Sequence, residues 1–236
     1  MIPHPLNLWM IMSFMTAGSM NAVHITKFSN ICHRCLNERK KMLNNMNKVI
    51  LTDCDGVLMN WEYAFNVWMH TQGYKMVEGG GAHYDMGDRY GLDHKDKKKI
   101  VRQFNESAAI GFLPPLRDAM YYVDLLHRKH GYVFHMITSL SKDESAQKLR
   151  ILNTKKLFGE TAFEKFIFAD TGEDKDEYLE PYRGSGYIWI EDKVENALLG
   201  DTLGLESLIV EHEHNMKKTD LPFFKNWKEI YEYITG

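Results

Sequence analysis

From residue 48 onward, short apolar runs alternate with stretches that have the periodicity of amphipathic helices. The apolar runs cover residues 48–52, 132–138, 165–169, 186–190 and 206–210. The helical stretches cover residues 60–72, 93–109, 116–130, 142–157 and 226–234, with shorter ones on either side of residues 186–190. Short apolar strands that alternate with amphipathic helices predict an α/β protein whose parallel sheet is covered by helices on both faces.

Polar side chains follow three of these strands at the point where each strand ends. They are Asp53 and Asp55 after the first strand, Thr138 and Ser139 after the second, and Glu191 and Asp192 after the fourth. The carboxyl ends of parallel strands meet at one edge of the sheet, where such folds bind ligands. A cluster of carboxylates repels itself unless a divalent cation lies among them, and Mg²⁺ prefers oxygen ligands together with a substrate phosphate. The sequence therefore predicts a site for Mg²⁺ and phosphate at this edge.

Three motifs occur in a fixed order at these strand ends. They are Asp53-Cys54-Asp55-Gly56-Val57, then Thr138 after the run YVFHMI, then Glu191-Asp192 after the run YIWI. Together they resemble the haloacid dehalogenase-like (HAD) superfamily of phosphotransferases, over about residues 48–215. The resemblance implies a Rossmann-like three-layer core with a small helical cap inserted after the first strand.

The resemblance also implies a mechanism of Mg²⁺-dependent phosphoryl transfer. Asp53 would attack phosphorus and form an aspartyl-phosphate. Asp55 would protonate the leaving oxygen and then deprotonate the attacking water. The metal ligands would be the Asp53 carboxylate, the backbone carbonyl of Asp55, and Asp192. An acid at position 55 indicates phosphoryl transfer, because members that cleave carbon–halogen bonds lack one there.

A lysine completes the implied site by neutralising charge on the phosphoryl group. Lys175, before a short helix, suits the placement in the family, while Lys142 and Lys148 after the second strand are rivals. Thr138 offers a hydroxyl and an N–H beside a helix start, where phosphate oxygens bind readily. Thr138 and Lys175 are thus expected in catalysis and, with Ser139, in substrate binding.

The segment between the first two motifs is too long for a minimal strand connection. We expect a helical cap at residues 60–111, a core at residues 48–59 and 112–236, and an N-terminal extension at residues 1–47. Trp61, Phe65 and Trp68 have helical spacing and are interpreted as the buried face of a cap helix. Tyr63 lies off that face and is the expected stacking contact for a nucleobase.

A second, narrower resemblance indicates the substrate class. The cap, the run VEHEHN and the run WIEDKVENALLG are similar to HAD-like 5'-nucleotidases, including deoxyribonucleotidases and small phage-encoded proteins. A nucleoside monophosphate is the implied substrate. The alternatives are a sugar-phosphate phosphatase or phosphomutase, and a non-catalytic scaffold that binds nucleotide or protein. His212 and His214 are interpreted as surface residues rather than substrate contacts.

Net charge and cysteine content limit the possible binding partners and the cellular compartment. The net charge of -3 gives no electrostatic basis for binding a nucleic-acid polymer. Three cysteines do not form a disulfide framework, which favours a reducing, cytoplasmic compartment. Cys32 and Cys35 form a single CxxC, too few ligands for structural zinc, and Cys54 is interpreted as incidental.

The first 47 residues differ in character from the rest. Residues 5–23 carry no charged side chain, so a signal or membrane anchor is a weaker alternative to the extension. The stretch lacks a basic flank and contains several polar residues, which argues against a membrane span. The sequence does not indicate an oligomeric state.

Overall fold

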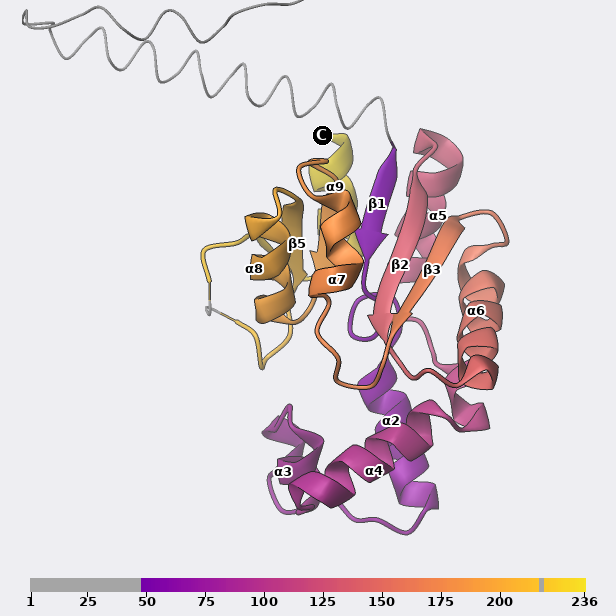
Figure 1. Cartoon of the computed structure of the whole chain (residues 1–236), viewed down its shortest axis with the longest axis vertical. Helices are drawn as coiled ribbons and strands as arrows, with labels where there is room; N and C mark the ends of the chain where they lie inside the picture. The colour runs from indigo at the N-terminus through magenta and orange to yellow at the C-terminus, as the bar shows by residue number, and fades with distance from the viewer. Residues whose placement is uncertain (1–47, 217–218) are drawn as a thin grey trace, which may run out of the picture. The chain divides into compact units, whose positions relative to one another are not determined.

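A six-stranded parallel sheet forms the centre of the part of the chain that the structure describes. The computed structural model describes residues 48–216 and 219–236. The strand order is β3-β2-β1-β4-β5-β6, and each neighbouring pair is parallel. Figure 1 shows β3, β2 and β1 next to one another. The strands are β1 (Val49–Thr52), β2 (Val133–Ser139), β3 (Phe163–Ala169), β4 (Ile188–Glu191), β5 (Glu206–Val210) and β6 (Phe223–Phe224). The predicted α/β architecture is confirmed. The two-residue β6 is an addition, because so short a pairing has no readable periodicity.

Helices connect the strands and extend the chain between β1 and β2. The α-helices are α2 (Trp61–Thr71), α3 (Met86–Tyr90), α4 (His94–Asn105), α5 (Ala119–His130), α6 (Glu144–Phe158), α7 (Asp176–Leu179), α8 (Val194–Thr202) and α9 (Trp227–Thr235). The 3₁₀ turns are η1 (Gly80–Ala82), η2 (Ala108–Phe112) and η3 (Glu180–Tyr182). Several begin at a side-chain cap; Asp143, for example, accepts a hydrogen bond from the Ala146 N–H and starts α6.

Alternate residues of the central strands enter two separate cores. Ile50 of β1 packs in the core that also contains Val123 of α5 and Ile230 of α9. Its neighbour Leu51 packs in the opposite core with Leu179 of α7. Successive side chains of a strand point to opposite faces, so both faces of the sheet are buried and the domain has three layers.

β1 lies where the strand order changes direction. The chain moves outward through β2 and β3 on one side of β1, and through β4, β5 and β6 on the other. The crevice outside the carboxyl ends of the strands at such a switch point is the usual ligand site of open α/β sheets. Asp53, at the end of β1, is therefore at the expected centre of a site.

The segment between β1 and β2 forms a helical group beyond the carboxyl ends of the strands. In Figure 1, α2, α3 and α4 lie beyond the arrowheads of β1 and β2. Phe65 is fully buried and stacks on Trp61 at 4.7 Å, with Phe104 of α4 edge-on at 5.3 Å. Trp68 also packs on Phe65. The predicted buried face of this helix is confirmed, and aromatic packing holds α2 against α4.

Some predictions fall outside the described residues. These are the N-terminal extension, the weakly apolar residues 5–23, and the CxxC at residues 32–35. Among the residues that the structure describes, no helix has both the length and the apolar character needed to cross a membrane.

Candidate active site

The first aspartate motif forms a tight turn directly after β1. The Asp53 N–H donates to the Ile190 carbonyl at 2.9 Å, so the sheet still positions Asp53. Gly56 has a φ of 76°, and a Cβ atom there would collide with Oδ2 of Asp192. Only glycine allows both this backbone conformation and this close approach. The turn therefore brings the first motif directly against the last one.

Three carboxylates and one lysine form a buried cluster at this edge. Asp53, Glu191 and Asp192 each offer an oxygen atom, and these atoms lie within 4.8 Å of one another. The Lys175 ammonium is 3.0 Å from Oδ1 of Asp53 and 3.1 Å from Oε1 of Glu191. Its side chain is 2% exposed. The fold thus unites residues of the first motif, the last motif and the loop before α7.

Burial and mutual repulsion shift the protonation of the cluster. Burial, followed by the charge of Asp53, raises the pKa of Asp192 to about 8. The same causes hold the pKa of Glu191 well above its ordinary value. Burial opposes the charged form of Lys175, but Asp53 and Glu191 outweigh it, and the pKa of the ammonium is raised. Lys175 therefore stays charged. Its single positive charge does not balance the three carboxylates of the cluster.

Asp55 pairs with a different cation, Arg150 of α6. The Arg150 Nη1 is 2.5 Å from Oδ1 of Asp55, and Nη2 is 3.3 Å from Oδ2. Nη1 also donates to Sγ of Cys54 at 2.9 Å, so that buried thiol contacts the site through the arginine. Burial raises the pKa of Asp55, and the Arg150 charge offsets it only in part.

The end of β2 offers a hydroxyl that has no partner. Oγ1 of Thr138 is buried and makes no hydrogen bond within residues 48–216 and 219–236. Ser139 beside it donates to the Glu173 carbonyl at 3.2 Å. A buried hydroxyl without a partner costs free energy, and a bound anion could supply the missing acceptor. Thr138 is thus prepared for a ligand, whereas Ser139 is already engaged.

The two rival lysines do not lie in the cluster. Lys142 is 55% exposed and lies 3.2 Å from Glu173 and 2.8 Å from the Tyr178 hydroxyl. Lys148 is 72% exposed and pairs along its own helix with Glu144 at 3.4 Å. The structure therefore places Lys175 beside Asp53 and neither rival there.

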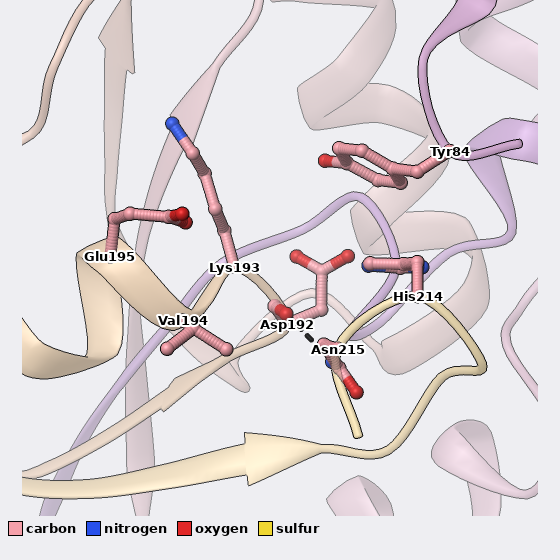
Figure 2. A pocket seen from close by; sticks show the side chains of 7 residues that line it. All are labelled: Tyr84, Asp192, Lys193, Val194, Glu195, His214 and Asn215. Carbon is pink, nitrogen blue, oxygen red and sulfur yellow. Dashed lines mark hydrogen bonds between the residues drawn. The ribbon is translucent and has the colours of Figure 1, made fainter. Parts of the chain in front are cut away.

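A cavity of about 120 Å³ opens beside Asp192. Figure 2 shows the residues that line it, with the Asp192 carboxylate directed toward Tyr84 and His214. The Tyr84 and His214 rings stack, with centroids 4.1 Å apart and planes 27° apart. Asn215 donates to the Asp192 carbonyl at 2.7 Å and holds the loop after β5 in place. The cavity is thus bounded by the core and by the segment before α3.

Tyr84 comes from the inserted segment and faces the acidic cluster. Its side chain is half-exposed, yet the pKa of its hydroxyl is raised. Desolvation by the surroundings is the main cause, and the charges of Asp192 and Glu191 follow. Tyr84 and Asp192 line the same cavity, so the phenol lies near enough to the acidic cluster for the carboxylate charges to affect its pKa.

Tyr63 lies in a different groove. That groove is lined by residues of α2 and η2 and by Pro114, and Tyr63 is 59% exposed in it. None of the residues that line it belongs to the acidic cluster. The structure does not bring Tyr63 together with Asp53 or Asp192.

His212 and His214 are half-buried at the site rather than plain surface residues. His212 Nε2 is 2.7 Å from the Gly56 carbonyl, and burial lowers the pKa of its ring. His214 stacks on His212 at 5.3 Å and on Tyr84. The interpretation as surface residues was wrong because the loop after β5 folds back over the turn after β1.

Two solved structures share this architecture. A haloacid dehalogenase-like family hydrolase from Streptococcus pneumoniae is 16% identical and has a TM-score of 0.55, over 78% of this chain and 97% of its own. A putative HAD-hydrolase from Bacillus subtilis, solved with bound magnesium, is 16% identical and has a TM-score of 0.54, over 79% and 97%. This chain has the HAD-like fold.

Sequence comparison adds one relative from a bacteriophage. An uncharacterized 32.4 kDa protein from the Gp30-rIII intergenic region of Enterobacteria phage T4 is 26% identical over 138 residues. The match covers 56% of this chain and 48% of the relative, so the chain spans about half the length of that protein. No protein-family model matches the chain.

The charges of the site in this HAD-like fold suit one divalent cation. The site holds four carboxylates, those of Asp53, Asp55, Glu191 and Asp192, and two buried cations. Lys175 pairs with Asp53 and Glu191, and Arg150 pairs with Asp55. Full ionisation leaves an excess of two negative charges. All the free donors are oxygen atoms, which is the ligand chemistry of Mg²⁺. The residues present therefore fit that metal.

Sequence reasoning did not identify Arg150 or Tyr84. Arg150 carried a detectable signal, because it lies on the buried face of α6 between Ala146 and Thr154, which are four residues away on either side. A charge on the inward face of an amphipathic helix requires a partner. Tyr84 had no such signal, since it follows a glycine-rich stretch without periodicity.

We expect the metal-free protein to lose stability as the pH rises from about 6 to 8.5. A carboxyl whose pKa is raised in the folded state favours folding below its unfolded pKa, and that contribution disappears as the pH rises through the folded pKa, about 8 for Asp192. Mg²⁺ should restore stability, and more strongly at pH 8.5. Thermal unfolding after chelation, with and without added Mg²⁺, measures both effects. Asp192→Asn should reduce the pH dependence; an identical Mg²⁺ effect at both pH values would contradict the prediction.

Proposed function

We propose that this chain is a Mg²⁺-dependent phosphomonoester hydrolase of the HAD-like superfamily, acting through an aspartyl-phosphate. One arrangement carries the proposal. The same turn holds two aspartates, one against Lys175 and the acidic cluster and the other against Arg150. The unpartnered Thr138 hydroxyl lies at the neighbouring strand end, as a phosphate site requires.

The two aspartates divide the proposed chemistry between them. An Asp53 carboxylate oxygen forms a bond to phosphorus as the bond from phosphorus to the leaving oxygen breaks, and Asp55 gives its proton to that oxygen. Water then attacks the phosphorus, Asp55 takes a proton from it, and the bond to Asp53 breaks to release phosphate. The raised pKa of Asp55 helps it to hold the proton before the first step.

The remaining residues of the site bind and orient the phosphoryl group. The Thr138 hydroxyl and the Lys175 ammonium would contact its oxygens, with Ser139 at the rim. Mg²⁺, held by the Asp53 and Asp192 carboxylates and the Asp55 carbonyl, would neutralise charge that develops on the phosphoryl group.

We propose that residues 60–111 act as a cap that covers the site and excludes water. The connections into and out of this segment run side by side, because the Asn60 N–H donates to the Pro114 carbonyl and the Leu116 N–H to the Leu58 carbonyl. Tyr84 of this segment contacts His214 of the core. A cap that contributes a ring to the cavity can select the substrate as it closes.

A nucleoside monophosphate is the substrate class we propose. The stacked rings of Tyr84 and His214 beside Asp192 form a surface on which a nucleobase could stack while its phosphate reaches Asp53. Such a base would have to separate the two rings, since their centroids are 4.1 Å apart. Tyr63 remains the alternative stacking residue.

The proposed setting is the cytoplasm, and the proposed partner is a small phosphorylated molecule. Cys54 supports the first point, because it is a buried free thiol that accepts a hydrogen bond from Arg150. The net charge of -3 argues against a nucleic-acid polymer as the substrate.

A substrate screen tests the proposed function. Phosphate release would be measured with Mg²⁺ from nucleoside 5'-monophosphates, sugar phosphates and p-nitrophenyl phosphate. We expect turnover of p-nitrophenyl phosphate and of at least one nucleotide, and none after chelation. Release from sugar phosphates alone would favour the alternative substrate class. If no compound released phosphate, the proposed hydrolase would be contradicted, and the alternative of a non-catalytic scaffold that binds nucleotide or protein would be favoured.

Replacement of Tyr84 by leucine should raise KM for the nucleotide about tenfold with little change in kcat, since stacking of a base on an aromatic ring contributes roughly 1–3 kcal/mol. The KM for ribose 5-phosphate, which has no base, should not change. Tyr63→Leu is the matched control, because Tyr63 is a similarly exposed tyrosine in another groove. Steady-state kinetics of both variants measure these effects. If only Tyr63→Leu raised KM for the nucleotide, the base-stacking role would belong to Tyr63 instead of Tyr84.

A further inference from the structure

Arg150 is a charged residue on the buried face of α6. Its side chain is fully buried, and its helix neighbours on that face include Ala146, Thr154 and Phe158. Removing a guanidinium from water is costly unless its donors are paired. The position of Arg150 therefore requires partners that repay this cost or that serve a function.

The side-chain partners of Arg150 belong to one turn. Both terminal nitrogens contact the Asp55 carboxylate, at 2.5 Å and 3.3 Å, and Nη1 also contacts Sγ of Cys54. The Asp55 side chain is 22% exposed, so one side of it remains open beyond the arginine. Arg150 thus holds the turn that contains Cys54 and Asp55, and leaves the Asp55 carboxylate accessible.

A second buried arginine, Arg89, makes the contacts expected of a purely structural role. Arg89 of α3 is 3% exposed and pairs with Glu62 at 2.6 Å. It also donates to the carbonyl oxygens of His83 and Gly81, and so braces the loop before its own helix. Arg150 contacts no backbone carbonyl through the hydrogen bonds found for its side chain in the described residues. Its contacts are side chains of the aspartate motif.

We infer that Arg150 is a positioning residue that holds the Asp55 carboxylate in the orientation needed to reach the leaving oxygen of a phosphate ester. This inference rests on the proposed function. A planar guanidinium that contacts both carboxylate oxygens restricts rotation of the group, which a point charge cannot do. It also counters the repulsion between Asp55 and the neighbouring Asp53.

The leaving group supplies a way to detect this role. An alkoxide leaves poorly and needs a proton from Asp55, whereas p-nitrophenolate is stable and leaves without one. Loss of Arg150 should therefore slow cleavage of an alkyl phosphate, such as a nucleoside 5'-monophosphate, more than cleavage of p-nitrophenyl phosphate. A purely structural role would slow both to the same extent.

The experiment compares Arg150→Met and Arg150→Lys with the wild-type chain on both kinds of ester. We expect kcat for the nucleotide to fall by about 10- to 100-fold, toward the lower limit of a general-acid contribution, with a severalfold change at most for the aryl ester. Arg150→Met added to Asp55→Ala should cause little further loss. Arg89→Met is the matched control and should leave the ratio of the two activities unchanged.

The outcomes separate this inference from the proposed function. Equal losses on both esters, or full further loss in the Asp55→Ala background, would overturn the positioning role. If Arg150→Met does not fold, Arg150→Lys decides, because an unchanged ratio with a lysine at that position would show that the planar contact is not needed. Absence of wild-type turnover on either ester would instead contradict the proposed hydrolase.

Discussion

Asp53→Asn is expected to abolish turnover and leave the fold intact. The amide cannot attack phosphorus, and loss of a covalent nucleophile costs roughly 10⁵-fold or more in kcat. The variant should fold, because Lys175 keeps Glu191 as a partner at 3.1 Å and one of the repelling carboxylates is gone. This is the largest effect we expect from any single substitution.

Covalent labelling makes the result specific. Wild-type protein quenched in acid during turnover of p-nitrophenyl phosphate should carry a phosphoryl group on the peptide that contains Asp53, by mass spectrometry. Asp53→Asn should carry none. Asp55→Asn, the same chemical change two residues away, should still be labelled while turnover slows. Turnover by Asp53→Asn, or a label on another residue, would refute the mechanism.

Lys175→Met is expected to lower kcat/KM by about 10²- to 10³-fold, the scale of losing one preorganised charge at a reacting group. It should also lower the melting temperature. Asp53 and Glu191 would lose the ammonium that lies 3.0 Å and 3.1 Å from them, and an unpaired buried charge is strongly destabilising. Inhibition by inorganic phosphate should weaken in parallel, since the same ammonium would bind the product.

The two other lysines provide matched controls. Lys142→Met and Lys148→Met remove the same group from exposed positions and should leave kcat/KM and stability nearly unchanged. Kinetics and thermal unfolding of the three variants can be measured side by side. A loss of activity confined to Lys142→Met or Lys148→Met would transfer the phosphate-binding role away from Lys175.

The fold was predictable because its signal is local and repeated. Runs such as residues 49–51 and 188–190 are apolar throughout, as is typical of strands buried on both faces, and each is followed by a polar residue. The rule that parallel strands share one carboxyl edge then brings Asp53 and Asp192 together without coordinates. The weak element was β6, whose two residues pair with β5 only because the chain after that strand folds back.

Contacts between distant segments were not predictable in the same way. The placement of lysine in the family favoured Lys175 over Lys142 and Lys148, but no local pattern distinguished the three. In the structure, Lys175 is the one of the three that is buried against Asp53. Tyr63 and Tyr84 both lie in the inserted segment, and helical phase favoured Tyr63. The periodicity of a helix indicates which of its sides is buried. It does not indicate which loop of the inserted segment, such as the one that carries Tyr84, lies beside the site.

By itself, the sequence determined the parallel three-layer core and the edge at which Asp53, Asp55 and Asp192 gather, since strand alternation and parallel topology leave few other arrangements. Only the tertiary structure decided which cations meet those carboxylates: Lys175 at Asp53 and Arg150 at Asp55. The physical reason is that each of these buried pairs joins residues 95 or more positions apart in the sequence. Local periodicity carries no information about contacts at that separation.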